Sequence, residues 1–323
     1  MLRSLALLIM LLVADRAVFA NGSDRYLLIV TGIGGEPYYS ERFERRARTL
    51  LDVAEDYLAI PADQIVYLAD GVDGVPRSDR EAVLAALDDI AARSRPDDRI
   101  MMVLIGHGSI GSGGVLFNLP GPDLSADDLA DRLATFDDRQ LAIINASSAS
   151  APFINALSAP ERIVITATSS GAENQFTQFA DPFVAAFADP AADADKDRQV
   201  SLLEAFDYAN REVERHYRLE GLIRTEHAQL DDNGDGQGSR EPGADNGDGS
   251  LAQRFTLVAA ERGDDPVSRT RIQLQIQARR LVDRVEALKR LKPSLETDDY
   301  QNRLEQLLIE LALNRRTWRE AAP

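Results

Sequence analysis

A histidine and a cluster of serines follow two apolar stretches of this chain. Residues 100–108, IMMVLIGHG, predict a buried strand that runs into His107 and Gly108. Residues 140–150, QLAIINASSAS, predict a later strand that runs into a turn of small residues containing Ser147. A serine hydroxyl becomes a nucleophile when a base lies within about 3.2 Å of it and a third group orients that base. A histidine after one strand and serines after another have the residue types that such an activation needs.

The elements that position these residues alternate between strand and helix. Continuous apolar runs predict strands at Tyr26–Thr31, Gln64–Leu68, Ile100–Ile105, Leu141–Ala146 and Arg162–Thr168. Helices are expected over about 40–58, 78–94, Ser125–Phe136 and 151–158. Apolar strands separated by helices form a parallel sheet covered on both faces, so the sequence predicts an α/β fold. Ligands bind outside the carboxyl ends of such strands, and we expect His107, Ser147 and residues 168–174 along one rim.

The two motifs together resemble the catalytic core of the caspase-like, legumain-type cysteine peptidases. In that family a strand ending in His-Gly is followed by a strand ending in Ala-Cys-x-Ser-Gly, and this chain has ASSAS at residues 146–150. Ser147 stands in the place of the cysteine, and the chain contains no cysteine at all. Residues 117–125 resemble the family's short excursion after the histidine, and Thr168–Glu173 has the place of a wall of the primary specificity pocket. The resemblance implies a caspase-like three-layer sandwich with a mostly parallel sheet over residues 24–217.

The resemblance also implies a role for each residue of the centre. Ser147 takes the place of the nucleophile, His107 protonates the leaving amine, and the backbone N–H of Gly108 helps to bind the oxyanion. A thiol is partly ionised at neutral pH and very nucleophilic, whereas a hydroxyl needs an oriented base, and no motif designates the orienting group. We therefore expect a pseudopeptidase that binds a peptide or protein partner through a non-catalytic cleft. An active serine-type hydrolase or peptidase using Ser147 and His107 is the alternative, and a calcium-dependent structural scaffold is another.

An acidic segment, DADKDRQVSLLE, follows at residues 193–204. It matches a calcium loop of the EF-hand kind, in which the cation takes six to eight oxygen ligands. The predicted ligands are the side chains of Asp193, Asp195, Asp197, Ser201 and Glu204, together with the backbone carbonyl of Gln199. Arg198 replaces the glycine that is usual at the sixth position. An acidic N-terminal turn favoured by the helix dipole is the alternative interpretation.

A second acidic segment, rich in glycine, covers residues 230–250. Asp231, Asn233 and Asp235 form the D-x-N-x-D-G start of a calcium loop, but Pro242 stands at the twelfth position. A flexible acidic loop is the default for such a composition. A divalent ion would relieve the repulsion among these carboxylates, so both acidic segments predict Ca²⁺ as the cofactor.

The two ends of the chain predict further parts. Residues 1–20 combine a basic residue, an apolar run and a small-residue end, which predicts a cleaved secretory signal and a periplasmic or secreted location. An uncleaved anchor is the alternative. No later stretch is long enough to span a membrane. Residues 218–262 form the acidic, glycine-rich region, and two apolar stripes within residues 263–323 predict a helical hairpin. The net charge of −17 excludes the usual basic face of a nucleic-acid-binding protein.

Overall fold

The computed structural model describes residues 24–257 apart from 112–113, 137, 198 and 244–246, then single positions between 274 and 292, and residues 297–320. The predicted signal peptide at residues 1–20 lies outside the described residues, as does Arg198 of the first acidic segment. Among the helices of the described part, none is both long enough and apolar enough to cross a membrane.

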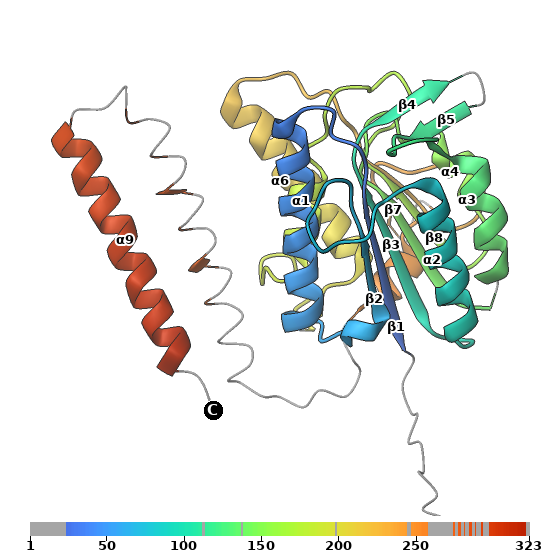
Figure 1. Ribbon diagram of the computed structural model, residues 1–323, viewed down its shortest axis with the longest axis horizontal. Coiled ribbons are helices and arrows are strands. Elements are labelled where there is room, and N and C mark those ends of the chain that lie inside the picture. The colour runs from blue at the N-terminus through green and yellow to red at the C-terminus, as the bar shows by residue number, and fades with distance from the viewer. Residues whose placement is uncertain are drawn as a thin grey trace, which may run out of the picture.

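A six-stranded sheet forms the centre of the molecule (Figure 1), in the order β2-β1-β3-β7-β8-β9. Its strands are β1 (Arg25–Thr31), β2 (Ile65–Leu68), β3 (Arg99–Ile105), β7 (Gln140–Asn145), β8 (Arg162–Thr166) and β9 (Gln229–Asp231). All neighbouring strands pair in parallel except β9, which is antiparallel to β8. The mostly parallel sheet confirms the α/β fold that the apolar runs predict.

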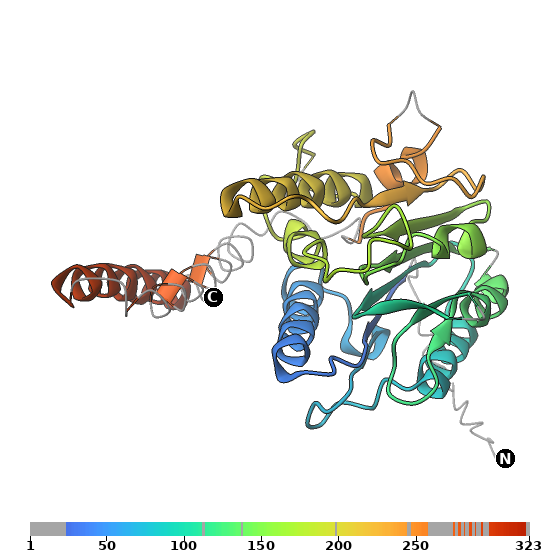
Figure 2. The ribbon, with the colours of Figure 1, turned by 90° about the horizontal axis from the view of Figure 1, so that it is seen from above.

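Helices cover both faces of this sheet, which gives three layers (Figures 1 and 2). On one face lie α1 (Pro37–Asp52), α5 (Ala180–Ala186), α6 (Leu202–Glu220) and α7 (Ser250–Arg254), and on the other lie α2 (Arg80–Arg93), α3 (Ala126–Leu133) and α4 (Phe153–Leu157). Successive strand residues point to opposite faces. Leu27 and Ile29 of β1 therefore join one hydrophobic cluster, while Leu28 and Val30 join the other. Both faces of β1 are buried, as its unbroken apolar sequence requires.

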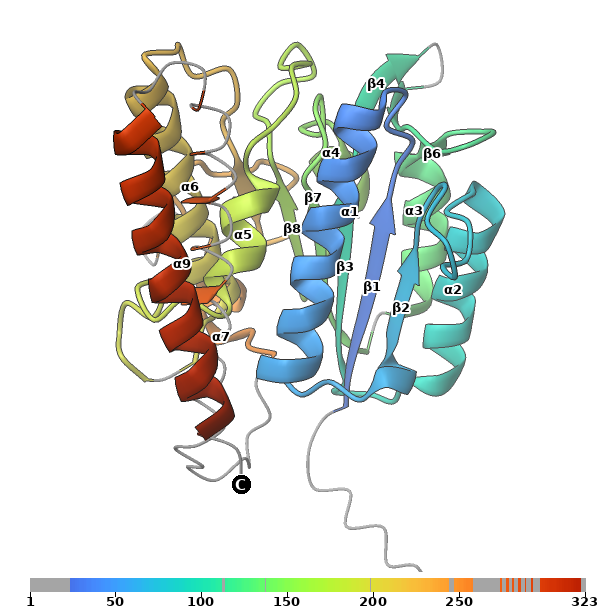
Figure 3. The same ribbon diagram turned by 60° about the vertical axis from the view of Figure 1, so that its left-hand side comes forward.

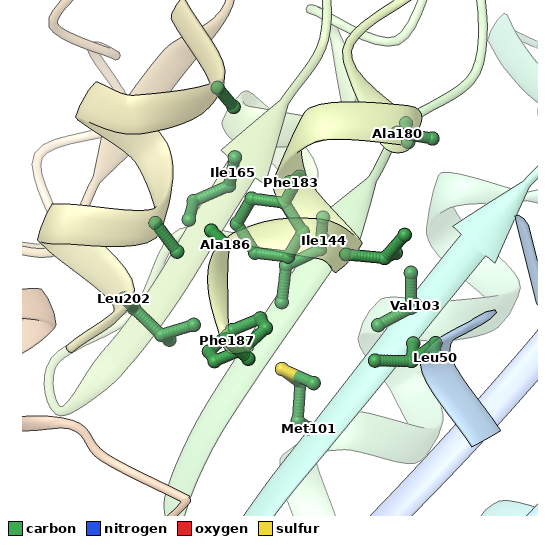
Figure 4. Packing of buried hydrophobic residues seen from close by; sticks show 14 of the residues in the cluster. Leu50, Met101, Val103, Ile144, Ile165, Ala180, Phe183, Ala186, Phe187 and Leu202 are labelled. Carbon is green, nitrogen blue, oxygen red and sulfur yellow. The ribbon is translucent and has the colours of Figure 1, made fainter. Parts of the chain in front are cut away.

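Aromatic rings of α5 fill the core on the face shared with α6 (Figure 4). Phe183 and Phe187 lie above Val103 of β3 and Ile144 of β7, with Leu202 of α6 beside them. The rings of Phe183 and Phe187 meet edge to face with their centroids 5.5 Å apart. Such large, fully buried side chains fix α5 and α6 on the sheet, because burial of each stabilises the fold by about 1.5–3 kcal/mol.

A second, three-stranded sheet begins directly after His107. It consists of β4 (Gly108–Gly111), β5 (Gly114–Phe117) and β6 (Leu124–Ser125), which pair in antiparallel fashion. The sequence predicts only a short excursion in this region. Glycines at the end of β4 and the start of β5 interrupt the apolar alternation that is typical of strands. The remaining alternation is too short to predict a strand from the sequence. The β4–β5 hairpin stands at the rim above the end of β3 (Figure 1).

The C-terminal part contains the long helix α9 (Thr297–Glu320), seen in front of α6 in Figure 3. Described positions between 274 and 288 are also helical and lie against it. Gln277 accepts a hydrogen bond from Asn314, and Arg284 pairs with Glu310. Residue numbers rise along one helix as they fall along the other, so the two run antiparallel. The residues of the shared cluster are Leu281, Val285, Leu288 and Leu307.

Candidate functional site

His107 and Ser147 follow the carboxyl ends of the adjacent strands β3 and β7, and Gly108 lies against the serine turn. A Cβ atom placed on Gly108 would lie 2.2 Å from the carbonyl oxygen of Ser148 and 2.9 Å from Oγ of Ser147. Neither distance is possible for a side chain, so only glycine fits at this position. The close approach puts the residue after the histidine in direct contact with the serine turn.

An aromatic group surrounds the imidazole of His107. The ring centroids of Tyr39, Phe43 and Phe176 lie 4.7, 5.1 and 6.3 Å from that of His107. Tyr39 and Phe43 come from α1, and Phe176 comes from the segment that precedes α5. The three rings also contact one another, and the imidazole packs half-buried against this cluster at the end of β3.

This environment favours the neutral imidazole. Burial lowers the pKa of His107 below its ordinary value of 6.5, and the nearby Arg46 guanidinium lowers it further. A hydrogen bond with the backbone of Gly34 opposes both effects in part. A histidine with a lowered pKa is uncharged at neutral pH. It can then act as a base that accepts a proton, but it does not carry the extra proton that a general acid donates.

The hydroxyl of Ser147 is turned into the protein. It donates a hydrogen bond of 2.6 Å to Oδ1 of Asn145, and the Ser147 backbone N–H donates to the same oxygen at 3.1 Å. Both residues are fully buried. Within the described part of the chain, no hydrogen bond joins Ser147 to His107, and Nδ2 of Asn145 is buried without a hydrogen-bond partner. Sequence reasoning missed Asn145, because a buried strand-end asparagine has no signature of its own.

The amide of Gly108 is also engaged. Its N–H donates to Oγ of Ser148 at 3.2 Å, and the Ser148 hydroxyl donates to the Gly108 carbonyl at 3.3 Å. The side chain of Ser148 is 2% exposed. The Gly108 N–H, which the resemblance assigns to oxyanion binding, therefore already donates its hydrogen bond to Ser148.

Residues 168–174 form a wall on the far side of the serine turn. The Ala149 N–H donates to the carbonyl of Glu173 at 2.8 Å, and the Ser150 hydroxyl lies 3.1 Å from that of Thr168. A Cβ on Gly171 would lie 2.5 Å from the side chain of Ile110 at the end of β4. The β4–β5 hairpin thus reaches across the rim and contacts this wall.

The wall also contains a pair of Glu173 and His227 that the sequence did not predict. The Glu173 carboxylate lies 2.7 Å from Nδ1 of His227, and it accepts hydrogen bonds from the backbone N–H groups of Ser169 and His227. Burial alone would raise the pKa of Glu173, but these hydrogen bonds outweigh it and lower the pKa. The two residues are 54 positions apart, and β9, which follows His227, was not predicted.

The first acidic segment brings three of its predicted ligands together. One carboxylate oxygen from each of Asp193, Asp195 and Asp197 lies within 4.8 Å of the other two. The Glu204 carboxylate instead accepts hydrogen bonds from Ala194 and Ser201 N–H groups, each at 2.9 Å. Burial alone would raise the pKa of Glu204, and these bonds lower it.

Ser201 and Glu204 form a reciprocal N-terminal cap of α6, in which the Ser201 hydroxyl accepts from the Glu204 N–H. Gln199 donates its N–H to Asp197 at 2.8 Å. The predicted ligand at the end of the loop is therefore committed to capping the helix.

The second acidic segment has a different arrangement. Asp231, at the end of β9, is 1% exposed, while Asn233 and Asp235 lie in the turn that follows. Asp248 belongs to this acidic run in the sequence but was not predicted as a ligand, and its Oδ1 accepts the Asp232 N–H at 3.2 Å beside the turn. Burial and then the charges of three neighbouring aspartates raise the pKa of Asp248 to about 6.

Residues 77–229 match the model of the Peptidase C13 family. The matched segment contains β3, β7 and β8, and with them His107, Ser147 and the wall at residues 168–174. None of the curated proteins matches the chain. The family match supports the caspase-like, legumain-type resemblance of the fold.

Proposed function

We propose that this protein is a legumain-like pseudopeptidase whose rim binds a peptide or protein without cleaving it. The hydrogen bond from the Ser147 hydroxyl to Asn145 is the observation on which the proposal rests. A hydroxyl attacks a carbonyl only after a base removes its proton, and here the proton points to an amide oxygen that is not a base.

The position of Ser148 supports the same conclusion. An oxyanion needs donors placed 2.7–3.1 Å from the position that it will occupy, and each such donor contributes about 3–4 kcal/mol to the transition state. The Gly108 N–H already donates to Ser148. Nucleophile and oxyanion donor are thus both engaged by neighbouring groups, and hydrolysis would require both to be released.

Exposed apolar side chains around the rim suit an extended peptide or a protein surface. Ile33 follows β1, Tyr38 begins α1, and Ile110 lies in the hairpin after β3, with exposed fractions of 38%, 57% and 61%. Apolar side chains that gather on one rim are typical of interaction surfaces. Together with the aromatic group around His107, they offer an apolar lining for a side chain of the partner.

A fluorophosphonate probe tests the absence of catalysis, because it labels activated serines and leaves inert ones unmodified. We expect no labelling of the purified full chain and no turnover of peptides with Asp, Asn, Arg or Lys at the cleavage site. Labelling that disappears in Ser147→Ala but persists in Ser148→Ala would overturn the pseudopeptidase assignment. That outcome would support the serine-type hydrolase, for which the neutral His107 is a suitable base.

Peptide-library binding tests the partner. We expect Tyr38→Ala and Ile110→Ala to weaken the binding of selected peptides, while Leu313→Ala, on the exposed side of α9, leaves it unchanged. Equal effects of all three substitutions would show that apolar exposure alone, and not the rim, is responsible.

Export of the chain is part of the same proposal. The composition of residues 1–20 favours a cleaved secretory signal, and a periplasmic or secreted location gives access to calcium. Cell fractionation with N-terminal sequencing of the mature chain tests it, and a cytoplasmic protein that retains Met1 would overturn it.

A further inference from the structure

The turn after β9 contains a buried carboxylate oxygen with no hydrogen-bond partner. Asp231 accepts a hydrogen bond from the Gly234 N–H at its Oδ1, with a distance of 3.2 Å. This bond directs the carboxylate into the turn that follows the strand. Its other oxygen, Oδ2, is buried and has no partner within the described residues. Burial of a charged oxygen without a partner is costly, so a partner is expected to complete the site.

No basic side chain supplies that partner. In the part of the chain that the structure describes, no basic side chain forms an ion pair with Asp231, Asp235 or Asp248, and the charges of Asp231 and Asp235 act on Asp248. Like charges without a counter-charge repel one another. A cation would convert this repulsion into attraction.

Two side chains of the same turn present further oxygens. Asn233 and Asp235 occupy alternate positions after Asp231, and each side chain accepts a hydrogen bond at 2.8 Å from the N–H two residues later. Gly234 follows Asn233 and Gly236 follows Asp235, and their φ angles are +79° and +76°. This left-handed backbone is open to glycine and lets the turn wind tightly, as calcium loops do.

Asp248 takes the place of the acid that is missing at the end of the loop. Its Oδ1 accepts the Asp232 N–H at 3.2 Å, and a Cβ on the neighbouring Gly247 would lie 3.3 Å from the side chain of Asn233. A return segment, residues 247–249, therefore brings the Asp248 carboxylate beside the turn, 17 residues beyond Asp231. Pro242, which stands where the EF-hand pattern has its bidentate glutamate, is not needed for this role.

Asp232 has a different function. Its two carboxylate oxygens accept hydrogen bonds from the N–H groups of Gly249, Leu251 and Ala252, at 2.7 to 2.8 Å. It holds the return segment and the start of α7 in place. Its acceptors are satisfied, which separates it from the residues that face the turn.

We propose that Asp231, Asn233, Asp235, the carbonyl of Gln237 and Asp248 bind one Ca²⁺. Oxygen ligands from carboxylates, an amide and a carbonyl are the set that this cation prefers. The site lies at the edge of the sheet, because it follows the edge strand β9. Gly236 of the turn donates its N–H to Ser158, at the end of α4, with a distance of 3.0 Å. The ion would therefore join β9 and the return segment to the body of the molecule.

Calorimetric titration and thermal unfolding of the chelator-treated full chain test the site with CaCl₂ and with MgCl₂. We expect a Kd for calcium of about 10⁻⁴ M, as in extracellular modules, a melting temperature that rises by several degrees at ten millimolar calcium, and a smaller rise with magnesium. Asp235→Asn and Asp248→Asn should each weaken calcium binding by at least tenfold. Asp195→Asn, in the first acidic segment, is the matched control and should leave binding unchanged.

Asp231→Asn separates ion binding from a structural role. The substitution removes a repelling charge, so the variant without calcium should melt at or above the temperature of the wild type, and it should no longer respond to calcium. Absence of any calcium response in the wild type would overturn the proposal. A response that survives in Asp235→Asn and Asp248→Asn but is lost in Asp195→Asn would also overturn it, because the ion would then lie in the first segment.

Discussion

The Oδ1 atom of Asn145 accepts hydrogen bonds from both the hydroxyl and the backbone N–H of Ser147, at 2.6 and 3.1 Å. Both residues are fully buried. Turning the hydroxyl out to the rim would remove one of these bonds from a buried acceptor, which costs about 1–3 kcal/mol. The serine turn is therefore stable in a conformation in which the hydroxyl faces away from a substrate.

Restoring a cysteine should not restore a peptidase. The side chain in Ser147→Cys occupies the same buried position, and the Gly108 N–H remains engaged with Ser148. We expect turnover of peptide substrates no higher than that of Ser147→Ala, measured with fluorogenic peptides. Efficient cleavage by the cysteine variant would show that the rest of the centre is intact.

The glycine after the histidine should tolerate no side chain. In Gly108→Ala the new Cβ would lie 2.2 Å from the backbone oxygen of Ser148, so the strand end must shift. We expect the free energy of unfolding to fall by roughly 1–3 kcal/mol, measured by denaturant titration. Gly243→Ala is the matched control, because its new Cβ would meet no described atom within 4 Å apart from its chain neighbours, and its effect should stay within about 0.5 kcal/mol.

His107 should contribute to the loss of stability in acid. Burial and Arg46 depress its folded-state pKa below 6.5, so the unfolded chain binds this proton first. The contribution of His107 is present above pH 6.5 and is lost as the pH falls below it, with a slope of at most about 1.4 kcal/mol per pH unit. Unfolding free energies measured between pH 7.5 and 5 should fall less steeply in His107→Gln than in the wild type. The same slope for His107→Gln and for the wild type would contradict this assignment, and His216→Gln, at an exposed position, serves as control.

The cap of α6 should stabilise the fold independently of calcium. Ser201→Ala removes the hydroxyl that accepts the Glu204 N–H, and we expect a loss of about 1 kcal/mol. Ser40→Ala, at an exposed position within α1, should change stability by less than about 0.5 kcal/mol. The rise in melting temperature with calcium should be preserved in Ser201→Ala. Loss of that rise would indicate that the first acidic segment binds the ion.

The sequence predicts the sheet well where strands are long and apolar. Ile100–Ile105 lies within β3, Tyr26–Thr31 lies within β1, and their parallel order places His107 and Ser147 along one rim. This success follows from burial on both faces, which leaves an unbroken apolar run in the sequence.

The rest depends on contacts that no local pattern encodes. β9 has three residues and is defined only by its pairing with β8, and the bond between Glu173 and His227 follows from that pairing. The direction of the Ser147 hydroxyl depends on the hydrogen bond that it donates to the buried Asn145 side chain. Asp248 lies beside the turn after β9, but the calcium pattern does not fix the number of residues that separate it from Asp231.

The inner strands of the sheet are long and contain uncharged apolar runs, while the outer strands are short, and this order has a consequence for aggregation. The inner runs, such as MMVLI in β3 and LAII in β7, contain neither charge nor proline and have a strong tendency to pair with copies of themselves. The outer strands β2 and β9 have four and three residues, which is too short to recruit a strand from another molecule. The folded chain is thus protected at its edges, whereas an unfolded chain must bury β3 and β7 quickly to stay in solution.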